Sequence, residues 1–360
     1  MRQNIFHAHR APGQSIALVA LALLLLVALS GLALDGANAF NQRRNATNGA
    51  DAAAIAGTRA LIAQHKAGGG DNSAVYQAVE DYLNSHYLNQ GVALTWEAYY
   101  VDRQAQQLAG AQVTNTSDDV PTDARGVMVE LHYTFATVLM PVLGRPDLTV
   151  DATATAVYGP VTSVVGGDLI PLSISRTIAE QTENGDDLCI FGSESDTNPC
   201  GDSGAYQVQP GNFGQVSFNP NNAPNTTGNY NQDCLGNPAQ HQDSMSRWWC
   251  QGSQYDIYIG MQLWGDTGML SNSLADEMEW RLTNRPEGLV PVFGYVDDGS
   301  GNNARYTIVG FMAIRLEDFD VNGSADDRWV RAERINYYTT AGAFSSGAVD
   351  AGVYAINLVK

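Results

Sequence analysis

The stretch "DFDVNGSADD" is the strongest candidate for metal chemistry in this sequence. Asp318, Asp320 and Asn322 precede a glycine with the spacing of the first half of an EF-hand calcium loop, and Asp326 falls at the ninth loop position. Trp329 stands at the twelfth position, where a bidentate Glu belongs. Two interpretations stay open: a calcium-stabilised loop, with calcium as the one cofactor to expect, or a solvated Asp/Asn/Gly turn.

A second motif, "CGDSGAY" at Cys200–Tyr206, resembles the nucleophile segment of trypsin-like proteases, with Ser203 as the nucleophile. That chemistry needs a histidine base oriented by a carboxylate, and the six histidines are scattered without the expected neighbours. The sequence also lacks a phosphate loop, an HExxH motif and a dinucleotide fingerprint. We therefore expect no enzyme and no catalytic residue, although a secreted hydrolase using Ser203 is kept as a hypothesis.

All four cysteines lie in the second half of the chain, in two nested pairs. Their even number and spacing favour the disulfides Cys189–Cys200 and Cys234–Cys250 in an oxidising compartment, although other pairings stay open. Zinc-binding CxxC or HxxxH spacing is absent.

Aromatic residues cluster beside the last cysteine. Trp248 and Trp249, with Tyr255 and Tyr258 nearby, could form a platform for sugars or pack in a core beside the disulfide. Both interpretations stay open.

Composition limits the partners that this chain can have. Its 360 residues carry a formal net charge of -19, and Lys66 and Lys360 are the only lysines. Because an acidic surface repels nucleic acid, no nucleic-acid partner is expected. Frequent glycine and only 16% charged residues suit a secreted or surface-exposed domain rich in strands.

An uncharged apolar segment, Ile16–Leu34, predicts a transmembrane helix. As a helix it is about 28 Å long, close to the thickness of a bilayer's hydrocarbon core. Arg2 and Arg10 precede it without an acidic residue, which predicts a cytoplasmic amino terminus and an outside location for the rest. A signal peptide cleaved before Phe40 is the alternative, but the apolar run is longer than a usual signal core.

Small residues continue at helical spacing after this segment, which predicts one long helix whose outer half is a spine for the soluble part. They are Ala46, Ala50, Ala53, Ala54 and Gly57, and Leu61 falls at the same spacing. A bend near Gly31 or Gly36 is expected. The expected helix-interface residues are Asp35, Asp51, Ala53, Ala54 and Gly57. Asp35 could cap the bend, pair with Arg43, Arg44 or a neighbouring subunit, or simply be solvated.

The remaining chain predicts an antiparallel, strand-rich region. Strand-like runs begin at Val92, Gly126 and Asp147, after a short helix from Ala74, and the last two alternate apolar and small polar residues. A serine-capped helix is expected over Ser271–Leu282, followed by paired strands.

The predicted divisions are 1–66, 67–164 and 165–360. The predicted fold class is α+β: a transmembrane helix that continues into a long spine helix, followed by an antiparallel β-rich ectodomain.

The first sixth of the chain resembles TadG-like proteins of Tad (Flp) pilus assembly. The resemblance rests on Gly13–Gln14, Asp35–Gly36, Arg43–Arg44 and the "NGADAAAIAG" block at Asn48–Gly57. Two features depart from related patterns. Leu18 stands where a prepilin cleavage site has Glu, and the segment at 298–302 predicts a hairpin turn rather than the metal site of a von Willebrand A domain.

The resemblance implies a membrane-anchored structural component of a Tad pilus, similar to a minor pilin, with a pilin-like order of elements. Its expected partners are other pilus-assembly or pilin subunits, and the membrane through the amino-terminal helix. The expected location is the bacterial cell membrane, single-pass, with the carboxy-terminal domain outside. The alternative is a surface-displayed or secreted adhesin that binds calcium or glycans.

Overall fold

The structure is a computed structural model of the chain, and it divides into two compact units. Unit 1 comprises residues 1–156 and 358–360, and unit 2 comprises residues 157–357. The described residues are 14–66, 70–87, 93–190, 206–208, 215–219, 234–235, 245–265, 274–297, 304–322, 328–339, 343–345 and 347–359. Each unit is described by itself, and the three divisions expected from the sequence stay a prediction.

Unit 1 begins with one long helix, α1 (Gln14–Lys66), which confirms the predicted continuous helix. The helix remains α-helical through Gly31 and Gly36. Side chains of its first half are exposed, from Ile16 at 74% to Leu34 at 60%. Within the described residues, α1 is the one helix long and apolar enough to cross a membrane.

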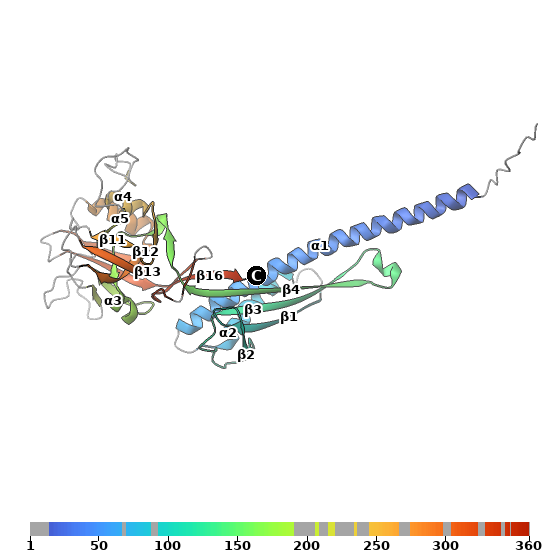
Figure 1. Cartoon of the computed structure of the whole chain (residues 1–360), viewed down its shortest axis with the longest axis horizontal. Coiled ribbons are helices and arrows are strands. Elements are labelled where there is room, and N and C mark those ends of the chain that lie inside the picture. Colours follow the sequence, from blue (N-terminus) through green and yellow to red (C-terminus); the bar gives the residue numbers. More distant parts are fainter. Residues whose placement is uncertain are drawn as a thin grey trace, which may run out of the picture. The chain divides into compact units, whose positions relative to one another are not determined.

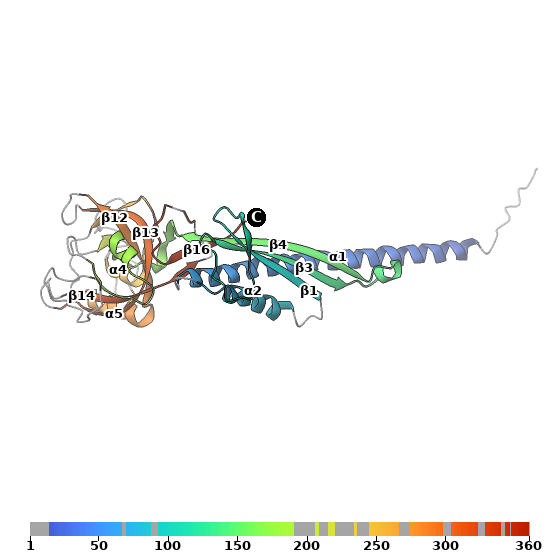
Figure 2. The ribbon, with the colours of Figure 1, turned by 90° about the horizontal axis from the view of Figure 1, so that it is seen from below.

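A shorter helix and a sheet cover the second half of α1 (Figures 1 and 2). Their bounds are α2 (Asn72–Tyr87), β1 (Ala93–Val101), β2 (Gln107–Gln112), β3 (Gly126–Ala136), the 3-10 helix η2 (Met140–Leu143) and β4 (Asp147–Pro160). In unit 1 the strands lie in the order β4-β3-β1-β2. Strand β1 pairs antiparallel with both β2 and β3.

The buried face of β3 packs on the helices because its residues alternate between buried and more exposed positions. Val127, Val129 and Leu131 are fully buried. A Cβ built on Gly57 of α1 would lie 2.7 Å from Val79 of α2 and 3.3 Å from Val127 of β3. Helix α1, α2 and the sheet therefore meet at a position where only a glycine fits without a shift.

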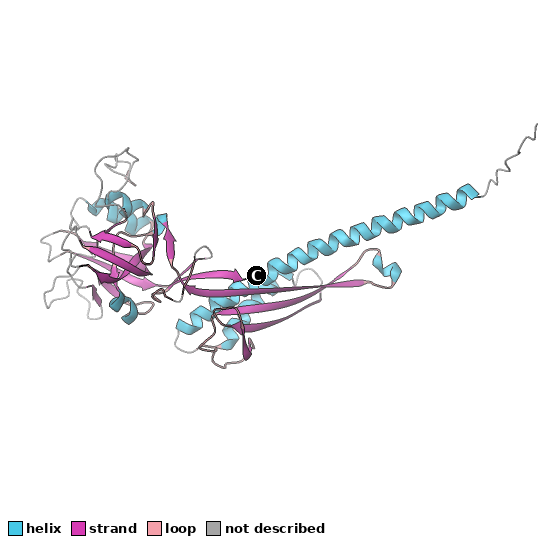
Figure 3. Cartoon of the chain, viewed as in Figure 1, coloured by secondary structure: helices cyan, strands magenta, loops and turns pink. Residues whose placement is uncertain are grey.

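Unit 2 is mainly strands, with short helices at its surface (Figure 3). Its largest sheet has the order β6-β12-β13-β14-β7-β8, and β11 pairs with both β13 and β9. The elements of this sheet are β6 (Ile174–Ser175), β7 (Asp187–Ile190), β8 (Tyr206–Val208), β9 (Val216–Ser217), β11 (Gln262–Gly265), β12 (Glu287–Val296), β13 (Arg305–Asp320) and β14 (Trp329–Ile335). The others are β5 (Ser163–Val165), η3 (Gly166–Asp168), α3 (Arg176–Gln181), α4 (Met245–Gln251), β10 (Asp256–Tyr258), α5 (Ala275–Asn284), β15 (Tyr337–Thr339) and β16 (Val353–Val359).

Strands β12 and β13 pair antiparallel as predicted, and together with α1 they give the α+β class expected from the sequence. The predicted helix before them is α5, but it begins later than expected. Its N-cap is Leu274, which makes no side-chain capping hydrogen bond, and the acidic residues Asp276 and Glu277 occupy the first turn. These carboxylates interact favourably with the helix dipole, and the serines expected as caps, Ser271 and Ser273, lie outside the described residues.

Candidate functional site

The junction between α1 and the β3–β4 hairpin is built around the carboxylate of Asp35. One oxygen, Oδ1, accepts a hydrogen bond from the backbone N–H of Val138 at 2.7 Å. The other, Oδ2, accepts from Leu139 at 3.0 Å and Met140 at 2.9 Å. Asp35 is 1% exposed. One carboxylate thus satisfies successive N–H groups at the start of η2, where a negative charge is favourable.

The hairpin tip, residues 137–146, also satisfies much of its own backbone. Thr137 Oγ1 donates to the carbonyls of Arg145 and Pro146, each at 2.9 Å. The N–H groups of Val142, Gly144 and Arg145 donate to tip carbonyls. Gly144 has a positive φ of 77°, a conformation that glycine adopts without strain, and it ends η2.

Gly31, one helical turn before Asp35, lets the tip approach α1 closely. A Cβ at this position would lie 1.9 Å from Leu139 Cδ1 and 2.8 Å from Leu139 Cβ. A Cβ on Gly36, in contrast, would meet nothing within 4 Å. The two glycines of the apolar end of α1 therefore differ in purpose: Gly31 is required by a contact and Gly36 is not.

An apolar crevice of about 220 Å³ lies between α1 and the hairpin tip. Seven of its eight lining residues are apolar, and Asp35 lies at its polar end. The lining residues are Leu24, Val27, Ala28, Leu32, Asp35, Leu139, Met140 and Val142. The tip also exposes apolar side chains to the surroundings: Val142, at the edge of the crevice, is 83% exposed, and Val138, outside it, is 66% exposed.

The structure places the remaining predicted interface residues against the chain's own sheet and helix. Ala53 and Ala54 are fully buried, Gly57 contacts α2 and β3, and Asp51 is half-buried. The small residues of α1 therefore already have a partner inside unit 1. The exposed apolar half of α1 is the part that is free to face a membrane or another subunit.

The partners of Asp35 differ from those expected from the sequence. Arg43 and Arg44 are exposed, and the carboxylate binds backbone N–H groups of the hairpin tip instead. These groups lie more than 100 residues further along the chain. Local spacing could not reveal such a contact.

Thr58 fastens α1 to the sheet by a second polar contact. Its hydroxyl donates to the carbonyl of Ala156 at 3.1 Å and accepts from the N–H of Val127 at 3.2 Å. The side chain is fully buried. This hydroxyl satisfies one donor and one acceptor of neighbouring strands in the core.

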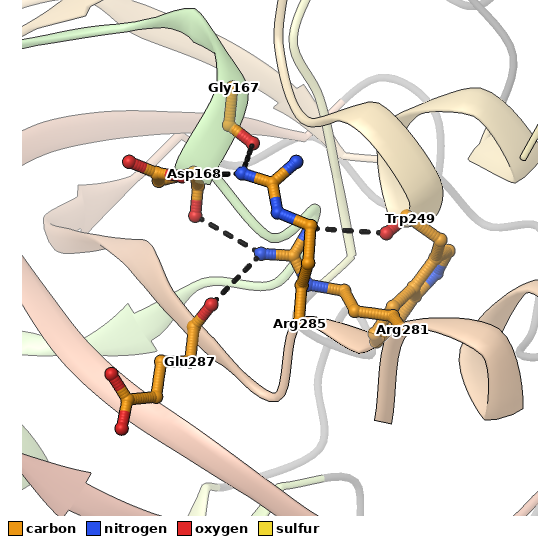
Figure 4. A network of polar contacts seen from close by, with 6 residues as sticks. All are labelled: Gly167, Asp168, Trp249, Arg281, Arg285 and Glu287. Atoms are coloured by element: carbon orange, nitrogen blue, oxygen red, sulfur yellow. Dashed lines mark hydrogen bonds and ion pairs between the residues drawn. The ribbon is translucent and has the colours of Figure 1, made fainter. Parts of the chain in front are cut away.

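A buried arginine organises a polar network within unit 2 (Figure 4). Arg281 of α5 donates to the carbonyls of Trp249, Asp168 and Glu287 at 3.1, 3.3 and 3.4 Å. Burial lowers the pKa of Arg281 to about 10. Arg285 donates to the Asp168 carboxylate at 2.6 Å. The guanidinium stays charged at neutral pH and joins α4, α5, η3 and β12.

The disulfide Cys234–Cys250 is present as predicted, with a Cα–Cα distance of 5.5 Å. Cys189 is disulfide-bonded as well. Its predicted partner, Cys200, lies outside the described residues, so that pairing stays a prediction.

The candidate calcium ligands are only partly described. Asp318 and Asp320 belong to β13, and their carboxylates accept the N–H groups of Phe319 and Asn322, respectively. Asp326 lies outside the described residues, as does Ser203. No group of three or more His, Cys, Asp or Glu residues suited to a metal ion occurs in the described part of the chain. Calcium binding stays a prediction.

The tryptophan pair packs in the interior and does not form a surface platform for sugars. Trp248 and Trp249 are fully buried and belong to two different core clusters. Trp248 meets Phe218 edge to face at 5.5 Å. Tyr258, at 53%, is the more exposed aromatic residue of the predicted group. The core-packing interpretation therefore describes the two tryptophans.

A family model matches the amino-terminal part of the chain. Residues 13–65 match the Tad family, described as Flp pilus-assembly TadE/G-like, in agreement with the resemblance found in the sequence. A search of the curated proteins and a search of the solved structures found no match. The matched segment is nearly the whole of α1, including Gly31 and Asp35.

The sequence reasoning missed the hairpin tip as part of the site. The strand-like run that begins at Gly126 continues in the sequence to Leu139, but β3 ends at Ala136. The signal that could have found the tip is "MPVLGRP" at 140–146, in which two prolines and a glycine break an apolar run.

Proposed function

We propose that this protein is a membrane-anchored structural component of a Tad/Flp-type pilus, similar to a minor pilin. One observation carries the proposal: the pilus-assembly match coincides with α1, a helix with an exposed apolar half and a buried half that carries the sheet. The exposed half is suited to lipid or to the helices of neighbouring subunits. The amino terminus is cytoplasmic in this proposal, since Arg2 and Arg10 precede the span without an acidic residue.

The outer domain acts through protein contacts in this proposal. The junction at Asp35 supports it, because the carboxylate fixes the hairpin tip to the helix at the end of the span. Because the hairpin tip is bound to α1 at the end of the span, no flexible linker separates the membrane-spanning part of α1 from the sheet of unit 1.

Site-specific photo-crosslinking in the native cell tests this function. A photoreactive residue at the exposed Leu21 or Leu25 is expected to form adducts with pilus-assembly or pilin subunits, identified by mass spectrometry. The matched control is the same residue at Leu61, which is fully buried in unit 1. Adducts with proteins unrelated to the pilus, from Leu21 and Leu25 alike, would contradict the proposal.

A further inference from the structure

We infer that the hairpin tip (residues 137–146) inserts into the outer leaflet of the membrane beside α1, with lipid acyl chains covering its apolar side chains and filling the crevice. This inference rests on the membrane anchoring in the proposed function. It adds a second membrane-embedded element to a chain that has one predicted span.

The depth of the contact supports the inference. The tip meets α1 at Gly31, and the crevice continues to Leu24. At ~1.5 Å per residue, these positions lie about 4 and 15 Å inside the end of the span at Leu34. One leaflet of a hydrocarbon core is about 15 Å thick. The tip therefore lies beside the outer half of the span.

The chemistry of the tip surface agrees with this depth. Val138 and Val142 are exposed apolar residues, and Leu139 and Met140 line the crevice. The next residue with a charge, Arg145, is exposed. An arginine beside an inserted apolar segment can reach the lipid phosphates.

The hydrogen bonds of the tip provide an independent argument. Irregular backbone is tolerated in hydrocarbon only where its polar groups have partners within the protein. Asp35 accepts the N–H groups of residues 138–140, and tip carbonyls accept those of residues 142, 144 and 145. Residue 141 is a proline and has no N–H. In water the N–H groups of residues 138–140 could donate to solvent. In hydrocarbon there is no solvent to accept these hydrogen bonds, so there the tip depends on the buried carboxylate of Asp35.

Lipid is favoured over a second protein chain as the occupant. The apolar lining is continuous with the exposed apolar face of α1, from Leu24 to Leu32. That face is surrounded by lipid in any single anchored copy. A partner helix would be an additional requirement.

Spin-label accessibility in full-length protein tests the inference. A nitroxide is attached to Val142→Cys, with native disulfides intact, in lipid nanodiscs that hold one copy each. Leu26→Cys in the span is the membrane control, and Gln107→Cys on β2 is the aqueous control, since both side chains are exposed. Val138→Cys is a second tip position.

We expect the labels at 142 and 138 to lose collisions with a water-soluble nickel complex and to keep collisions with oxygen, as at Leu26. If the labels at 142 and 138 are as accessible to nickel as the label at Gln107, the inference is wrong. If the Leu26 label is protected in the same experiment, the anchoring in the proposed function still holds. A nickel-accessible Leu26 label overturns the anchoring and the inference together. Protection at 142 that occurs only in nanodiscs with several copies identifies a second copy as the occupant, which also overturns the inference.

Discussion

Asp35 is a charged side chain that lies at the end of an apolar span and is nonetheless almost fully buried. Its burial is tolerated because the three backbone N–H groups of the tip solvate the carboxylate in place of water. A neutral side chain at this position cannot offer the same set of acceptors. At the residue scale, this carboxylate therefore determines whether the hairpin tip stays on α1.

Replacing Asp35 is expected to release the tip. In Asp35→Ala, hydrogen exchange of the amides of Val138, Leu139 and Met140 should rise by about tenfold or more, because each loses a charge-assisted hydrogen bond. Asp35→Asn should have a smaller effect, since one amide oxygen remains. The control is Asp147→Asn at an exposed carboxylate. Unchanged exchange at the three amides in Asp35→Ala would show that the carboxylate does not hold the tip.

The stability of unit 1 is expected to depend on pH through His65, and the sign of this dependence can be predicted. Its Nε2 donates to the carbonyl of Pro121 at 3.0 Å, and burial lowers the pKa of its imidazole below 6.5. The unfolded chain therefore binds a proton at a higher pH than the folded chain does. The contribution to stability is present above pH 6.5 and is lost as the pH falls toward the folded pKa.

The measurement compares urea unfolding of the native chain and His65→Gln between pH 7.5 and 5. The native chain should lose stability with acidification more steeply than the variant. His132 is present in both proteins, so its opposite contribution cancels in the comparison; its pKa is raised mainly by the hydrogen bond to Asp151. If the free energy of unfolding changes with pH in parallel in the two proteins, His65 does not contribute to the pH dependence of stability.

At the scale of elements, α1 combines two surfaces in one unbroken helix. Its first half exposes apolar side chains, and its second half buries small residues against α2 and β3. The glycines mark where each surface needs close approach: Gly31 for the hairpin tip and Gly57 for the meeting of α2 with the sheet. Small residues at such positions allow backbones to approach, as they do at helix contacts in membranes.

Substitution of the two glycines near the end of the span should give opposite results. Gly31→Ala places a methyl group against Leu139 and should destabilise tip docking by about 1–3 kcal/mol, the usual cost of overpacking. Gly36→Ala should be neutral or stabilise the helix by about 0.5–1 kcal/mol. Hydrogen exchange of residues 137–146 measures both. Adding Leu139→Ala to Gly31→Ala should restore part of the docking, because it removes the side chain that the new methyl group meets. Equal effects of the single variants Gly31→Ala and Gly36→Ala on hydrogen exchange would refute the contact.

Thr58 should matter for the attachment of α1 to the sheet. Thr58→Val keeps the shape but leaves the buried N–H of Val127 without its acceptor, at a cost of about 1–3 kcal/mol. Thr58→Ser keeps the hydroxyl and should lose less. Thr47→Val is the matched control on the exposed side of the same helix, with an expected change within about 0.5 kcal/mol. Urea unfolding measures the free energy of unfolding of the three variants. If Thr58→Val loses no more stability than Thr47→Val, the Thr58 hydroxyl does not stabilise the attachment of α1 to the sheet.

The sequence predicted the parts of this fold that depend on local patterns. The run of apolar residues predicted α1, alternation predicted β3, two consecutive strand-like runs predicted the β12–β13 pair, and spacing predicted Cys234–Cys250. It missed contacts that depend on tertiary structure, such as Asp35 with the tip and Arg281 with three carbonyls. Their partners are far along the chain or are backbone groups, which leave no trace in residue spacing.

At the scale of the whole molecule, the chain joins an apolar helix to a disulfide-bearing region. Disulfides persist in oxidising compartments, so unit 2 is expected to fold outside the cytoplasm. This agrees with the orientation that the arginines before the span predict. The formal net charge of -19 makes contact with nucleic acid unfavourable.

Loss of Cys234–Cys250 should destabilise unit 2 in particular. The bond joins residues 16 apart, and a loop of this size contributes about 3 kcal/mol in the chain-entropy model. The double variant Cys234→Ser, Cys250→Ser should therefore show faster hydrogen exchange in β12 and β13, while α2 and β3 in unit 1 exchange as before. Equal exchange of β12 and β13 in both proteins would contradict this contribution.

The most direct test of the central claim is mass spectrometry of pili and membranes purified from the native cell. An anchored pilus component predicts that this chain appears with pilus proteins and that peptides from the Ile16–Leu34 span are retained. A protein that is free in the medium and begins at Phe40 would contradict the account, because it would lack the apolar half of α1, Gly31 and Asp35.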